Sequence, residues 1–98
     1  MGTRRRPPAG GWPDAVETVP LRDTAADAPK GARAGERVVE PEDPPAVRVW
    51  ITYGREQREA ELDGWAIGWT SRQVRVRYLD AAGRQGWAWV WASAVTRR

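Results

Sequence analysis

The sequence predicts a small all-β fold: an antiparallel barrel of four or five short strands over residues 46–98, preceded by a disordered arm over residues 1–45. Three observations lead to this prediction. All eight prolines lie within the first 45 residues, and all but one of the seven tryptophans lie after them. From residue 46 onward, apolar and polar side chains alternate with the two-residue period of a half-buried strand.

The arm lacks the pattern of a folded segment. Its large apolar side chains are few and follow neither the strand period nor the helix period. Ordering a residue costs about 1–2 kcal/mol of conformational entropy, and such a segment buries too little apolar area to offset that cost. We therefore expect disorder, and we interpret the basic run Arg4–Arg6 as a solvated tail in preference to a phosphate contact.

The first two strands are predicted over residues 47–53 and 58–67. The first has an apolar and a mixed face: Val47, Val49, Ile51 and Tyr53 opposite Arg48, Trp50 and Thr52. Within the second strand we prefer a bulge at Asp63-Gly64 to a tight hairpin turn, because a turn would leave two very short strands.

The remaining elements follow in order. They are a turn at 70–72, a third strand at 73–79, a connection at 80–83, a fourth strand at 86–91, a short helical turn at 92–94 and a closing strand at 95–97. The third strand turns Val74, Val76 and Tyr78 inward by the same alternation. In the connection, Gly83 can take a positive φ.

The fourth strand carries tryptophans at every second position, so that Trp87, Trp89 and Trp91 share one face. Paired strands must match their core faces, since a one-residue slip moves every side chain to the other side. Three indoles do not fit inside a barrel this small, and we expect this tryptophan row to lie outside. The small residues around them, with the closing valine, then line the core: Ala88, Val90, Ala92 and Val95.

Arg75 and Arg77 of the third strand face the same side as the tryptophan row. Two registers satisfy the face rule: Arg77 beside Trp87 with Arg75 beside Trp89, or Arg77 beside Trp89 with Arg75 beside Trp91. Either register interleaves guanidinium groups with indoles, and an exposed cation–π contact contributes about 0.5–1 kcal/mol. Two residues of the first strand extend this surface if that strand lies nearby: Arg48 and Trp50.

The stretch WVWASAV, residues 89–95, is similar to the V-P-A-S-Y-V motif that ends SH3 domains. The run EAEL followed by VRVRYLD also looks like consecutive strands of Tudor-type domains. The resemblance covers residues 47–97 and implies an SH3-like barrel with a 3₁₀ turn before its last strand. The proline and tyrosine that help form the proline-peptide groove of SH3 domains are Trp91 and Ala94 here. The resemblance therefore predicts the fold more than the ligand.

The composition excludes several kinds of chemistry. The absence of cysteine and histidine removes disulfides, thiolate sites, the commonest general base and the commonest metal ligand. Ser71 and Ser93 lack any recognisable base, so we expect no enzyme, no cofactor, no metal site and no small-molecule substrate. No apolar run approaches the roughly 20 residues of a membrane helix. We expect a cytoplasmic protein without membrane contact.

Two further groups receive structural interpretations. Trp65 and Trp69 are expected to pack at the edge of the core in preference to forming a ligand site. The acidic stripe Glu59, Glu61 and Asp63 is expected to face water, and it could also complement the basic face of a second copy.

The charge and the tryptophan row leave three interpretations of function. Residues 46–98 carry nine basic and five acidic side chains, a mild net charge of +4. One is a non-enzymatic module that binds a protein partner or a second copy. Another is nucleic-acid binding, in which indoles stack on bases for about 1–3 kcal/mol each and arginines neutralise phosphates. The third is purely structural, with arginine stems shielding the indoles. The candidate partner-binding residues are Arg48, Trp50, Arg75, Arg77, Trp87, Trp89 and Trp91.

Overall fold

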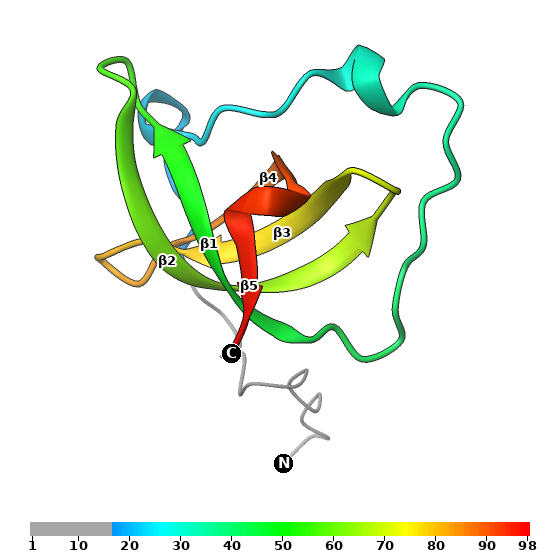
Figure 1. The fold of residues 1–98 in the computed structure, drawn as a ribbon. Helices are drawn as coiled ribbons and strands as arrows, with labels where there is room; N and C mark the ends of the chain where they lie inside the picture. The colour runs from blue at the N-terminus through cyan, green and yellow to red at the C-terminus, as the bar shows by residue number, and fades with distance from the viewer. Residues whose placement is uncertain (1–16) are drawn as a thin grey trace.

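The computed structural model of the chain describes residues 17–98 and has an all-β fold (Figure 1). The strands are β1 (Ala46–Tyr53), β2 (Arg58–Trp69), β3 (Gln73–Leu79), β4 (Gln85–Trp91) and β5 (Val95–Arg97). Three short 3₁₀ turns accompany them: η1 (Leu21–Asp23), η2 (Lys30–Arg33) and η3 (Ala92–Ala94). None of these helical turns has the length or apolarity to cross a membrane. The prediction of an all-β fold is confirmed.

All five strands belong to one antiparallel sheet with the order β4-β3-β2-β1-β5. Consecutive strands pair with one another from β1 to β4, and η3 then carries the chain across so that β5 pairs with residues 47–49 of β1. β4 and β5 are the two edges and do not pair, so the sheet curls strongly without closing on itself (Figure 1).

The core lies on the inner face of the curled sheet. Its buried residues from the strands are Val47, Val49, Ile51, Ala66, Val76, Tyr78, Ala88 and Val90. Ala88 and Val90 face inward as predicted, but Ala92 is exposed. The reason is that the chain leaves strand geometry and enters η3 at this residue, so Ala94 packs against the core instead.

β2 is a single strand of 12 residues, but its irregularity is not where the sequence suggested. Its pairing with β3 shifts register between Ala66 and Gly68. The predicted bulge at Asp63-Gly64 is therefore wrong, because Gly64 stays in the ladder. A Cβ at Gly64 would come within 2.9 Å of the Arg77 carbonyl oxygen, so glycine there permits the close approach of β2 and β3.

Two other glycines act at the positions where backbone or packing requires them. Gly83 has φ of +80° in the connection between β3 and β4, as predicted. Gly86 lies under the Tyr78 ring, and an added Cβ would collide with that ring. The absence of a side chain at Gly86 therefore allows the large Tyr78 side chain to lie in the small core.

Residues 17–45 are ordered against the sheet, so the expectation of disorder does not hold for this part of the arm. Val19 is only 6% exposed and joins the core. Its N–H donates to the Gln85 carbonyl at 2.8 Å, on the free edge of β4. Order here comes from uncovered strand edges, which present unpaired backbone groups, and not from a periodic apolar pattern. The rest of the predicted arm, residues 1–16 with Arg4–Arg6, lies outside the described residues.

The beginning of this segment, residues 17–28, spans the opening between β4 and β1 (Figure 1, blue to cyan). On the β4 side the Ala28 N–H donates to the Trp89 carbonyl at 2.7 Å. On the β1 side the Gly54 N–H donates to the Thr24 carbonyl at 3.2 Å. The segment thus occupies the gap that β5 leaves open, since β5 covers only the first half of β1.

Candidate binding groove

β3 and β4 pair in the first of the two predicted registers. Arg77 lies opposite Trp87, and Arg75 lies opposite Trp89. These four side chains are on the outer face, because the residues that alternate with them are buried. The prediction that the tryptophan row faces outward is confirmed.

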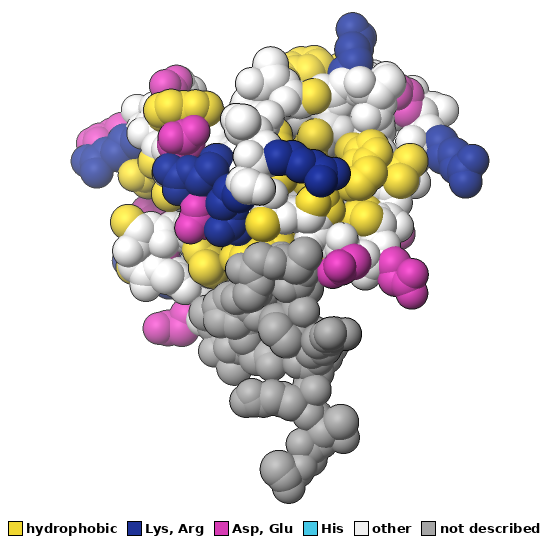
Figure 2. All heavy atoms as spheres, turned by 60° about the horizontal axis from the view of Figure 1, so that its bottom comes forward, with side chains coloured by type: hydrophobic (Ala, Val, Ile, Leu, Met, Phe, Trp, Pro, Cys, Tyr) yellow, Lys and Arg dark blue, Asp and Glu magenta, His cyan; other side chains and the backbone are white. Residues whose placement is uncertain are grey.

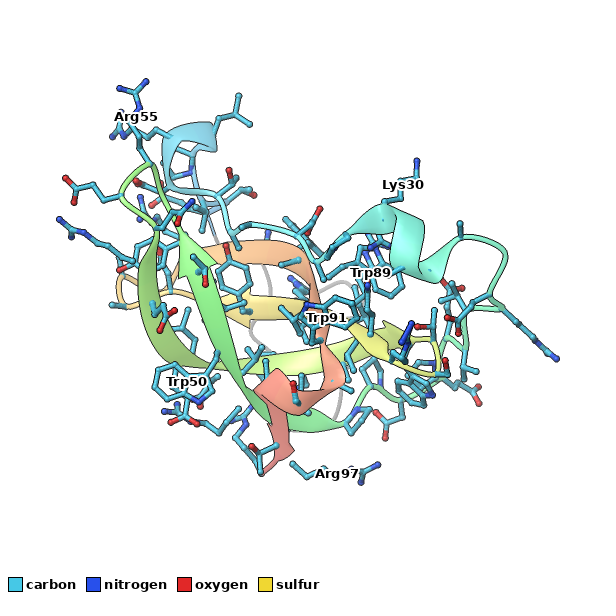
Figure 3. All side chains as sticks on the ribbon, turned by 45° about the horizontal axis from the view of Figure 1, so that its top comes forward. Lys30, Trp50, Arg55, Trp89, Trp91 and Arg97 are labelled. Atoms are coloured by element: carbon cyan, nitrogen blue, oxygen red, sulfur yellow. The ribbon has the colours of Figure 1, made fainter. Side chains whose placement is uncertain are left out.

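The tryptophan row is not evenly exposed. Trp87 and Trp91 are each 41% exposed, but Trp89 between them is half-buried. The guanidinium of Arg33 lies over the Trp89 ring, 4.3 Å from its centroid. In Figure 3, Trp89 lies below the η2 turn that carries Lys30. The arm therefore divides the row into two separate exposed ends.

The Gln73 side chain holds the η2 turn over Trp89 through two hydrogen bonds. Its side chain is fully buried, at 0% exposure. Arg33 Nη1 donates to Gln73 Oε1 at 2.9 Å, and Gln73 Nε2 donates to the Pro29 carbonyl at 3.1 Å. Every polar atom of this amide group is thus used within the protein. The burial of Gln73 could not be predicted from the sequence, because a polar residue at the start of a strand carries no signal of burial.

At the Trp87 end of the row, the nearby guanidinium is already engaged. Arg77 lies over the Trp87 ring at 5.8 Å, and its Nε donates to Gln85 Oε1 at 2.9 Å. Arg75 is exposed. Of the two predicted arginines, Arg75 is therefore the one whose side chain projects into solvent.

Arg48 does not extend the row, because it lies in the half of β1 that pairs with β5, away from the free edge of β1. Arg48 Nη1 donates to Asp63 Oδ1 at 2.7 Å, and its Nη2 lies 3.4 Å from Glu61 Oε1. The hydrogen bond from Arg48 holds the pKa of the Asp63 carboxyl below its usual value. Arg48 and part of the acidic stripe thus neutralise each other on the sheet surface.

Trp65 lies on the outer face but is 3% exposed. The Arg98 guanidinium covers its ring at 4.9 Å, and it also donates to the carbonyls of Val47 and Gly64, each at 3.0 Å. Trp69 packs against the core on the inner face. The register shift in β2 puts these two tryptophans on opposite faces, whereas an unbroken strand would have put them on one.

A groove of about 360 Å³ lies between the end of β4, the free edge of β1 and the arm. Trp91 lines it from β4 and Trp50 from β1, and the two side chains lie apart in Figure 3. Trp50 is 52% exposed. Asp27 and Glu59 also line the groove, and no lysine or arginine of the described residues does. The groove therefore combines aromatic surface with negative charge.

A second hollow of about 180 Å³ opens beside Tyr78 on the inner side of the sheet. Its charged groups satisfy one another: the Asp80 carboxylate accepts from Arg84 Nε at 2.7 Å and from the backbone N–H groups of Ala82 and Arg84 at 2.9 and 2.8 Å. Burial opposes ionisation of Asp80, but the bonds from Arg84 outweigh it and lower its pKa. This constellation stabilises the β3–β4 connection.

No protein-family model, curated protein or solved structure matches the chain. Residues 17–98 hold no group of three or more side chains suited to a metal ion. Among the described residues, the groove and the tryptophans that flank it form the candidate functional site.

Proposed function

We propose that this chain is an interaction module that binds a protein segment in the groove between Trp50 and Trp91. The observation that carries the proposal is the exposure of these two indoles, 52% and 41%, on either side of a concave surface. Apolar surface gathered around a groove marks interaction sites, and tryptophan is enriched among the residues that dominate protein–protein binding. Three of the seven residues predicted for partner binding line the groove: Trp50, Trp89 and Trp91. The arm half-covers Trp89, so Trp50 and Trp91 are the exposed ones.

We further propose that the fold is SH3-like. The order of the strands, with β1 between β2 and β5, and the η3 turn before β5 support this proposal. Two residues of WVWASAV, Trp91 and Ala94, line the groove. Trp91 stands where SH3 domains have proline, so this position of the groove is aromatic here. A groove built in this way suits an extended peptide.

Nucleic-acid binding is the second candidate, and one observation favours it. Exposed Trp87 and exposed Arg75 lie on neighbouring strands of the outer face, an arrangement that suits stacking on a base beside a phosphate. On the face that Figure 2 shows, basic and acidic side chains are interspersed. The groove itself is lined by carboxylates, which repel phosphates. These features support a protein ligand over nucleic acid.

The experiment is a selection from a display library of random peptides with the full chain as bait. Bound peptides are retested against Trp91→Ala and against Trp87→Ala, a matched control on the same strand face with the same 41% exposure. The proposal expects enriched peptides that lose binding to the Trp91 variant and retain it with the Trp87 variant. Enriched peptides that depend on Trp87 alone, or no enrichment, would overturn it.

A further inference from the structure

We propose that the groove recognises arginine side chains, so that its ligand is an extended, arginine-bearing peptide of a partner protein. This inference rests on the proposed function and specifies its ligand. It follows from three observations: how the protein covers its other outer-face tryptophans, which tryptophans it leaves without such cover, and where the negative charge of the groove lies.

The protein covers its outer-face tryptophans with its own arginines. Arg33 lies 4.3 Å from the Trp89 ring centroid, Arg98 lies 4.9 Å from that of Trp65, and Arg77 lies 5.8 Å from that of Trp87. The guanidinium group is planar and weakly hydrated, and it stacks on an indole while donating hydrogen bonds at its edge. Both Arg33 and Arg98 do this, since each also donates to acceptors beside the ring.

Trp50 and Trp91 are the exceptions on this face. Among the described residues, no arginine or lysine lies over either ring. Both rings line the groove, and both are more exposed than Trp65 or Trp89. Trp65, Trp87 and Trp89 use their rings to stack with arginines of the protein itself. The rings of Trp50 and Trp91 offer the same kind of surface to an arginine of a partner.

The negative charge of the groove favours a cationic side chain over these two rings. Asp27 and Glu59 are its two charged lining residues. Asp27 Oδ1 accepts a hydrogen bond from the backbone N–H of Trp89 at 2.9 Å, which fixes the carboxylate at the groove beside the tryptophan row. Glu59 is exposed on β2, opposite Thr52 of β1. A guanidinium on either indole then has a carboxylate available on the same surface, and the pairing of charge with aromatic contact is complementary to arginine.

The spacing of the indoles indicates an extended ligand. Trp50 and Trp91 come from different strands, lie apart in Figure 3 and line the same groove, so we expect an extended ligand to contact both. A peptide that lies along the groove contacts one ring with each of two arginines. The rest of the groove lining includes small neutral residues, such as Pro29 and Ala94.

The test is an NMR titration of the ¹⁵N-labelled full chain, following the indole N–H signals of its tryptophans. Trp→Phe substitutions assign the signals of Trp50, Trp87 and Trp91. Three peptides of equal length serve as probes: alternating Gly-Arg, alternating Gly-Lys and alternating Gly-Gln. We expect the Arg peptide to shift the Trp50 and Trp91 signals, the Lys peptide to bind more weakly and the Gln peptide to leave them unchanged at concentrations up to roughly 1 mM.

The carboxylates are tested by the double change Asp27→Asn and Glu59→Gln. Affinity for the Arg peptide should fall about 3- to 10-fold, the loss expected for removing two partly exposed ion pairs. The matched control Glu42→Gln removes an exposed carboxylate that does not line the groove, and it should change affinity by less than about 2-fold.

The outcomes distinguish this inference from the proposed function. If the Gln or Lys peptide shifts the Trp50 and Trp91 signals as strongly as the Arg peptide does, arginine recognition is wrong and the binding groove stands. Signals that move with protein concentration alone would identify a second copy as the occupant and overturn arginine-peptide recognition. An Arg peptide that moves the Trp87 signal instead, or none, overturns the inference, and the library selection then decides the proposed function independently.

Discussion

The outer face of the sheet carries two kinds of tryptophan. Trp65 and Trp89 are covered by arginines, Trp65 buried and Trp89 half-buried, whereas Trp50 and Trp91 have no such cover among the described residues and flank a groove. Trp87 is intermediate, since it is exposed and yet lies near the engaged guanidinium of Arg77. The tryptophans of the outer face thus differ in role, and the role depends on whether an arginine lies over the ring.

The cover comes from distant parts of the chain. Arg33 belongs to the arm, and Arg98 follows the last strand. Each arginine makes hydrogen bonds that hold it over its ring, to Gln73 for the first and to backbone carbonyls for the second. The covered tryptophans therefore stabilise the fold, and the uncovered pair is available for binding.

Trp65→Ala should have the largest effect on stability. It removes a large, 3% exposed side chain from under Arg98 and leaves a cavity, so we expect a loss of about 3–5 kcal/mol in the free energy of unfolding. Denaturant unfolding of the variant and of Trp50→Ala measures the contrast. Equal stability of these two variants would show that the division of the tryptophans is wrong.

Gln73→Ala should have the next largest effect, and it should act on the arm first. The Pro29 carbonyl and Arg33 Nη1 lose their buried partner, which costs about 1–3 kcal/mol. Hydrogen exchange gives the readout: the amide of Ala28, which donates to Trp89, should exchange faster than expected from the global loss of stability. If the Ala28 amide and the amides of β1 accelerate by the same factor, the arm does not open separately.

The Arg48–Asp63 pair should give a smaller, pH-dependent effect. The folded pKa of Asp63 is lowered by the hydrogen bond from Arg48, and the unfolded value is about 3.9. The pair therefore stabilises the protein above about pH 4, and this contribution is lost as the pH falls through the folded pKa. Asp63→Asn should cost less than about 1 kcal/mol at pH 7, because both groups are partly exposed, and should flatten the dependence of stability on pH below about 4. An unchanged acid profile would contradict the role of this pair.

Trp50→Ala and Trp91→Ala should have the smallest effects on stability. Each ring is exposed, so we expect changes within about 0.5 kcal/mol in the free energy of unfolding. Denaturant unfolding checks this. A loss comparable with that of Trp65→Ala would assign the two indoles to the structure of the sheet and not to a binding groove.

Much of the sheet could be predicted from the sequence because its signals are local. The two-residue alternation gave the strand positions, and the face rule turned Ala88 and Val90 inward and Trp87 outward. The rule failed at Ala92, where a 3₁₀ turn changes the side-chain direction. It also does not identify the bulge beyond Ala66, because an extra residue in a ladder has no fixed composition.

The arm and the groove could not be predicted, because contacts between distant residues create them. Val19 is an isolated apolar residue in its segment and Gln73 is polar, yet both are buried through pairing with sheet edges and with η2. The groove joins Asp27 of the arm to Glu59 of β2, and no spacing in the sequence relates the two. Of the groove residues, Trp89 and Trp91 were predicted as members of the tryptophan row, and Trp50 as its extension from the first strand.

The most direct test of the account is the affinity of a selected peptide for three proteins: the wild-type chain, Trp91→Ala and Trp87→Ala. The two substituted tryptophans are on the same strand face and are equally exposed, so they differ in whether they line the groove. We predict that Trp91→Ala weakens binding about 10-fold or more, as expected for an aromatic contact at a binding site, and that Trp87→Ala changes it by less than about 2-fold. Equal losses in both variants, or a loss confined to the Trp87 variant, would contradict binding in the groove.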